Sequence, residues 1–144
     1  MTNRDPEKLR KLLTQNRLKK RAAELATRWS AHGVSASTVA HDRYWKLIDR
    51  LKSGRSWPLQ YVEDLSAKVR TFISGSDLMT VMGWNVEEEP ALLVSSEALL
   101  RTMHTIATVY PDGFILINDE SRSALMVDIV DDEGIHASVI DLPS

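Results

Sequence analysis

The sequence predicts an α+β fold, with helices in its first half and an antiparallel sheet in its second. Apolar residues recur at helical spacing in residues 1–75, whereas residues 76–144 contain short apolar runs of β character between turn-forming residues. This segregation is typical of α+β domains with an antiparallel sheet. At 144 residues, the chain has the usual size of one domain. We therefore expect residues 1–144 to form a single domain, with a basic helical layer at 1–75 and an acidic, sheet-bearing part at 76–144.

The helical layer is expected to contain three helices. The first runs from a cap at Asp5 to about Trp29, the second follows a cap within residues 35–38, and the third begins near Pro58. Glycines end the second and third helices. The apolar stripes that define the helices are Leu18, Ala22, Leu25 and Trp29 in the first, Tyr44, Leu47, Ile48 and Leu51 in the second, and Val62, Leu65, Val69, Phe72 and Ile73 in the third.

The first helix carries apolar residues on two faces. Leu9 lies nine residues before Leu18, which places it about 180° around a helix. Leu12 and Leu13 do not join the later stripe either. We therefore expect either a break near residues 15–16 or a contact of the first two turns with a different surface.

The second part is expected to contain one or two strands, a helix and then a three-stranded meander, so that the sheet is small and antiparallel. The expected elements are strands at 78–82 and 91–94, a helix over 96–107, and meander strands at 114–118, 123–130 and 135–141. A two-residue turn at Asp132-Glu133 would place His136 opposite Ile129 and turn Asp128 to the other face. We therefore do not expect a pair between His136 and Asp128.

The net charge of −2 conceals two parts of opposite sign. Residues 1–75 hold 16 of the 18 Lys and Arg and 7 of the 20 Asp and Glu, so they carry +9, and residues 76–144 carry −11. Basic residues are densest in residues 1–21. Such a stretch can be a solvated face, a face that pairs electrostatically with the acidic half of the chain, a nucleic-acid-binding surface or a site for an acidic protein.

Acidic residues gather in the connections beside the expected strands. If successive turns of the meander alternate ends, Asp112 lies near the last turn. These connections can be solvated turns, a metal site or a docking surface for a cationic protein, and the run 131–134 lacks the ligand spacing of a calcium loop. We adopt the docking surface as the hypothesis, and its candidate residues are Trp84, Glu87, Glu88, Glu89, Asp112, Asp131, Asp132 and Glu133.

No pattern of residues indicates an enzyme. The absence of Cys excludes disulfides, thiolate nucleophiles and Cys-containing zinc sites. No two of the four His stand at metal-binding spacing on one helix, and no phosphate-binding or nucleophile-elbow motif occurs. We therefore expect no catalytic residue, no cofactor and no metal.

The sequence also predicts a cytoplasmic location. The first residues are polar and include acids, so we expect no secretory signal. The longest apolar runs are far shorter than the ~18 residues of a membrane span. The lack of Cys fits a reducing compartment. We expect a soluble cytoplasmic protein that does not contact the membrane.

The C-terminal third resembles a known class of proteins. Residues 110–117 read Tyr-Pro-Asp-Gly-Phe-Ile-Leu-Ile, residues 123–129 read Ser-Ala-Leu-Met-Val-Asp-Ile, and an acidic turn and a final strand follow. Such a strand pair resembles those of small bacterial immunity proteins of polymorphic or contact-dependent toxin systems. The resemblance implies a non-enzymatic cytoplasmic protein that binds one toxin domain, often a nuclease, and blocks its active site.

Two functions are consistent with these patterns. In the first, the acidic part docks over a cationic toxin domain, because an acidic surface speeds association with a basic nuclease. The alternative is a nucleic-acid-binding regulator that uses the basic N-terminal helices. The short turn at residues 53–56, between the second and third helices, is loosely compatible with a helix-turn-helix.

Overall fold

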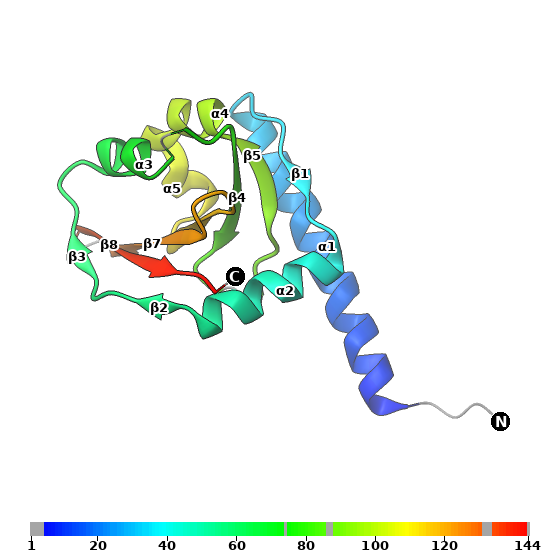
Figure 1. Ribbon diagram of the computed structural model, residues 1–144. Helices are drawn as coiled ribbons and strands as arrows, with labels where there is room; N and C mark the ends of the chain where they lie inside the picture. The colour runs from blue at the N-terminus through cyan, green and yellow to red at the C-terminus, as the bar shows by residue number, and fades with distance from the viewer. Residues whose placement is uncertain (1–4, 74, 86–87, 131–133, 144) are drawn as a thin grey trace.

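The computed structural model of this chain describes residues 5–73, 75–85, 88–130 and 134–143. Within these residues, an antiparallel sheet of eight strands carries helices on both of its faces (Figure 1). An α+β fold with an antiparallel sheet is therefore confirmed. No helix in these ranges is long and apolar enough to cross a lipid bilayer.

The sheet is larger than expected because short segments of the first part join it. In spatial order the strands are β1 (Ser37–Thr38), β5 (Leu92–Ser95), β4 (Leu78–Gly83), β6 (Gly113–Asn118), β7 (Ser123–Val130), β8 (Gly134–Asp141) and β2 (Arg55–Ser56), and β3 (Gln60–Tyr61) also pairs with β8. The expected strands in the second part are confirmed, and β6, β7 and β8 form the expected meander.

The strand residues alternate between two cores. On one face, Phe114 and Leu116 of β6 pack with α1 (Pro6–Ala31), α3 (Leu65–Ile73), α4 (Ser96–Arg101), the 3₁₀ turn η1 (Met103–Thr105) and α5 (Ile106–Val109). On the other face, Ile115 and Ile117 pack with α2 (His41–Ser53). All four β6 residues are buried. The middle of the sheet is therefore covered on both faces.

The prediction that three N-terminal helices form one layer is wrong. Among the described residues, the N-terminal part has one long helix, α1, of 26 residues. The shorter α3 shares one core with α1, whereas α2 packs in the core on the other face of the sheet, so the three helices do not form one layer. The expected helix over 96–107 is also divided into α4, η1 and α5.

The third helix begins later than expected because its first residues belong to the sheet. The N–H groups of Trp57 and Val62 donate to the carbonyls of Val139 and Ile135 on β8. These bonds, together with β2 and β3, satisfy the outer edge of β8. Asp64 caps α3 by accepting the N–H of Ala67 at 3.1 Å. β2 and β3 separate α2 from α3, so the short turn of the alternative helix-turn-helix reading is absent between these two helices.

The helix α1 is continuous through residues 15–16. Asp5 accepts the N–H of Glu7 at 3.0 Å, and Pro6 occupies the first turn, where its missing N–H costs nothing. The second half buries the expected stripe from Leu18 to Trp29. The first turns instead extend away from the rest of the chain (Figure 1), with Leu9, Leu12 and Leu13 exposed.

The hairpin of β7 and β8 has a register one residue away from the expected one. Val130 pairs with Gly134, which leaves three residues between the last paired positions instead of two. Gly134, the first residue of β8, has a φ of +82°, a conformation that glycine adopts without steric cost. His136 therefore lies opposite Asp128 and not Ile129.

Candidate functional site

One end of the sheet collects acidic residues from segments that are far apart in the sequence. Gly83, the last residue of β4, lies opposite Phe114, and Gly113, the first residue of β6, lies opposite Asp128 near the end of β7. The start of β5 reaches the same end, because β5 is antiparallel to β4. We call this end the acidic sheet end, and its described residues are Trp84, Glu88, Glu89, Asp112 and Asp128.

A shallow cavity of about 110 Å³ lies at the acidic sheet end. Three of the residues predicted from the sequence, Trp84, Glu89 and Asp112, line it together with Arg21 from α1 and Pro111. Trp84 is partly exposed and Asp112 is exposed. The cavity therefore brings an aromatic ring, a proline and acidic groups together.

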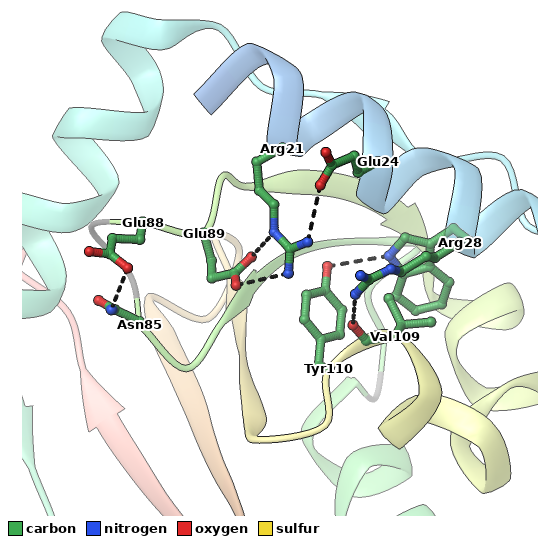
Figure 2. Close-up of polar contacts among 9 residues, drawn as sticks. Arg21, Glu24, Arg28, Asn85, Glu88, Glu89, Val109 and Tyr110 are labelled. Atoms are coloured by element: carbon green, nitrogen blue, oxygen red, sulfur yellow. Dashed lines mark hydrogen bonds and ion pairs between the residues drawn. The ribbon is translucent and has the colours of Figure 1, made fainter. Parts of the chain in front are cut away.

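Arg21 ties α1 to this end of the sheet (Figure 2). Its Nε and Nη2 atoms donate to the two carboxylate oxygens of Glu89 at 3.0 and 3.1 Å. Its Nη1 atom donates to Glu24 at 3.3 Å. The hydrogen bond to Glu89 raises the pKa of Arg21. Because its charge is matched inside the molecule, Glu89 holds α1 in place and is not assigned to a partner.

The wall of the cavity near Val109 and Tyr110 is also fixed to α1. Tyr110 is buried, and its hydroxyl accepts the Nε1–H of Trp29 at 3.3 Å. Burial raises the pKa of the Tyr110 phenol. Arg28 donates to the carbonyl of Val109 at 3.4 Å (Figure 2). These contacts hold the segment that presents Asp112.

Two glycines permit the close approach of the segments at this end. A Cβ at Gly113, whose φ is +122°, would lie 2.2 Å from the carbonyl oxygen of Val127. A Cβ at Gly83 would lie 2.5 Å from the side chain of Glu89. Gly113 lets β6 begin directly after Asp112, and Gly83 leaves room for the Glu89 carboxylate to reach Arg21.

The other acids of this end are not neutralised by any described basic residue. Glu88 is exposed and accepts a hydrogen bond from the side-chain amide of Asn85 at 3.1 Å. Asp112 is exposed, and Asp128 is partly exposed. The salt bridges of the described residues include none of the three. They are therefore available to attract a cation.

The remaining predicted residues, Glu87, Asp131, Asp132 and Glu133, lie outside the described residues. The strands that flank residues 131–133 end at the acidic sheet end, since Val130 pairs with Gly134. The N–H of Ile129 also donates to the carbonyl of Asp112. Asp112 therefore lies beside the end of β7, and the last turn of the meander lies outside the described residues.

Some basic residues of the first part form ion pairs with acidic residues of the second part. Besides the Arg21–Glu89 pair, Arg43 and Arg50 of α2 both contact Asp119, at 2.8 and 3.1 Å, at the opposite end of the sheet. The sequence alone does not reveal these pairs. The two residues of each pair lie about 70 positions apart in the sequence, so no local sequence pattern connects them.

Three of the four histidines contact side chains of the same molecule. No group of three or more His, Asp or Glu in the described ranges has a metal-binding arrangement. His32 contacts the hydroxyl of Thr108 at 2.8 Å, and His41 contacts the indole N–H of Trp45 at 3.0 Å. His136 packs edge-on against Tyr61, with ring centroids 5.9 Å apart.

Comparisons of the chain with models of known protein families, with curated proteins and with solved structures found no match.

Proposed function

We propose that this chain is a non-enzymatic binding protein whose acidic sheet end docks over a cationic domain of a cognate toxin, most simply a basic nuclease. The observation that carries the proposal is the convergence of Trp84, Glu88 and Asp112 at one end of the sheet. Trp84 and Glu88 lie in the connection between β4 and β5, and Asp112 lies between α5 and β6. Trp84 and Asp112 line the cavity.

The composition of this surface supports a protein partner. Trp is enriched among the residues that dominate binding energies at protein interfaces, and Trp84 is partly exposed beside Pro111. The carboxylates of Glu88 and Asp112 would surround such an anchor with negative charge. A rim of charge mainly raises the association rate and selects partners of opposite sign.

A toxin nuclease is the partner that the resemblance of residues 110–129 implies. Nuclease domains tend to be basic around the phosphate-binding site, so an acidic inhibitor offers the charge of the substrate. The geometry of the contacts at Arg21 and Tyr110 favours this use, because a surface held by buried and partly buried bonds loses little freedom on binding.

We expect the adjacent reading frame to encode a toxin, and the experiment uses the C-terminal domain of that toxin. The association rate and the residual nuclease activity are measured with the unchanged chain and with the double variant Glu88→Lys/Asp112→Lys. We expect the double variant to associate at least about tenfold more slowly at low salt. It should also protect the nucleic acid substrate less well.

The matched control is Asp77→Lys/Glu97→Lys, which changes the same number of exposed charges at the opposite end of the sheet. This control should associate nearly as fast as the unchanged chain. Equal rates for all three proteins would contradict the assignment of the acidic sheet end. Failure of the unchanged chain to bind the toxin domain at all would contradict the proposed function.

A second candidate, nucleic-acid binding, is favoured by the exposed basic residues of α1. Lys8, Arg10, Lys11 and Arg17 all lie on exposed turns. A mobility-shift titration with duplex and single-stranded DNA and RNA at low salt tests it. Retardation that weakens steeply with salt would support this candidate, and no retardation at micromolar protein would exclude it.

A further inference from the structure

The first turns of α1 form a surface that the fold does not use. We call residues 6–17 the basic arm. Its three leucines are exposed to 46% at Leu9, 53% at Leu12 and 60% at Leu13. Leucines at positions i, i+3 and i+4 lie together on one side of a helix, so they form one apolar stripe.

Within the described residues, this stripe does not pack against the body of its own molecule. Leu18, which is buried where α1 meets the rest of the chain, lies nine residues beyond Leu9 and about 180° around the helix. The helix is continuous between them. The stripe therefore points away from the core that the second half of α1 covers, and the described part of the chain leaves it exposed.

The charges of the arm indicate the chemistry of that molecule. Arg10 and Arg17 are seven residues apart and lie on one flank of the stripe, and Lys8 lies on the other flank. Glu7 is the one acid of the arm and contacts Lys11. The occupant must therefore offer an apolar contact surrounded by carboxylates.

A second copy of this chain presents such a surface. The acidic sheet end combines Trp84 and Pro111 with the carboxylates of Glu88 and Asp112, which pair with no described base. The arm also leaves the body at this end, since Arg21, one turn after the arm, is bonded to Glu89. At 1.5 Å per residue, the twelve residues of the arm reach about 18 Å further.

We propose that two copies of the chain exchange their basic arms about a two-fold axis, with each arm docked on the acidic sheet end of the other copy. A two-fold arrangement makes both contacts equivalent and closes the assembly at two copies. An anionic lipid surface fits the stripe less well, because the arm has three leucines and no aromatic residue to insert.

The dimer goes beyond the proposed function, since it needs no toxin and is tested with the chain alone. It also has a consequence for that function. The arm of the second copy covers the surface that a cationic toxin domain would use, so dimer formation and toxin binding exclude each other. The toxin would bind more tightly to a chain whose arm is disabled.

The experiment is sedimentation velocity of the full chain from about 1 µM to about 1 mM protein, at about 50 mM and about 500 mM salt. We expect a monomer–dimer equilibrium that shifts toward the monomer at high salt. Leu12→Gln/Leu13→Gln should raise the dissociation constant at least tenfold and leave the circular dichroism unchanged. The control is Leu78→Gln, an equally exposed leucine at the opposite end of the sheet.

A charge exchange makes the test specific for the two surfaces. One variant carries Arg10→Glu/Arg17→Glu, and the other carries Glu88→Lys/Asp112→Lys. Each alone should be monomeric, because its arm and its sheet end then have charges of the same sign. An equal mixture should form a heterodimer, since both contacts are complementary again.

Several results would overturn the proposal. They are a monomer at every concentration and salt, a dimer that Leu12→Gln/Leu13→Gln does not weaken, or a mixture of the charge variants that stays monomeric. Binding to vesicles of phosphatidylcholine and phosphatidylglycerol in equal parts, with the chain itself monomeric, would assign the arm to an anionic membrane surface instead.

Discussion

Arg21 of α1 and Glu89 before β5 are 68 residues apart in the sequence and share two hydrogen bonds, of 3.0 and 3.1 Å. This pair joins the basic and acidic parts of the chain at the acidic sheet end. It fixes the point at which α1 leaves the body, and it removes one carboxylate from the surface that we assign to a partner. Both proposals therefore depend on the same pair.

The Arg21–Glu89 pair should contribute measurably to stability. A double-mutant cycle with Arg21→Ala and Glu89→Ala is expected to give a coupling free energy of about 1 kcal/mol, because the contact is bidentate and partly buried. Urea unfolding measures it. The control cycle, Glu7→Ala with Lys11→Ala, involves a fully solvated pair and should give about 0.3 kcal/mol or less. Equal coupling in both cycles would contradict a special role of Arg21.

Gly113 should tolerate no side chain. Gly113→Ala is expected to lower the free energy of unfolding by more than about 2 kcal/mol, because a Cβ meets the carbonyl of Val127 and the φ is positive. Gly75→Ala is the control, since Gly75 also has a positive φ but open space around it. It should cost about 1 kcal/mol. A cost at Gly113 no larger than at Gly75 would argue against the close approach of β6 and β7.

Tyr110 should make the protein sensitive to alkaline pH. Its folded pKa is raised by burial, so as the pH rises above about 10 the unfolded chain releases the phenol proton before the folded chain does. Stability is therefore retained below pH 10 and falls above it, by up to about 1.4 kcal/mol per pH unit for this group.

The variant Tyr110→Phe isolates this effect. At neutral pH it should lose about 1–2 kcal/mol, because the indole N–H of Trp29 is left without its acceptor. Above pH 10 its stability should fall less steeply than that of the unchanged chain, as measured by urea unfolding at several pH values. Parallel pH profiles for the two proteins would show that Tyr110 ionises equally easily in both states.

Truncation of two leucines of the same helix should change the free energy of unfolding by very different amounts. Leu25 is fully buried, so Leu25→Ala is expected to cost about 2–5 kcal/mol. Leu12 is exposed in the single chain, and Leu12→Ala should change the stability of the monomer by less than about 0.5 kcal/mol. Unfolding curves at high salt, where the monomer should dominate, measure both. A large cost at Leu12 under these conditions would place the first turns of α1 against the body.

The meander was predictable because its signals are local. Alternating apolar residues and turn-forming connections identify β6, β7 and β8 without any knowledge of distant contacts. The strands β2 and β3 were not predictable, since two residues carry no periodicity and these segments are extended only because β8 offers an unpaired edge. The late start of α3 follows from the same pairing.

The candidate site was predictable in part. The alternation of hairpin ends places Asp112 at the end of the sheet where β7 ends, and Trp84, Glu89 and Asp112 line one cavity. The internal use of Glu89 was not predictable, because nothing near residue 21 indicates a partner at residue 89. The predicted register of the last hairpin was also wrong, because a run of four turn-forming residues allows either a two-residue or a three-residue connection.

The most direct test of the docking surface is hydrogen–deuterium exchange of the chain, alone and in complex with the cationic toxin domain. Docking at the acidic sheet end predicts slower exchange at residues 83–85, 88–89 and 109–113 in the complex, with little change in α3 and in the strands β2 and β3. Protection confined to α3, β2 and β3, with the acidic sheet end unchanged, would contradict it.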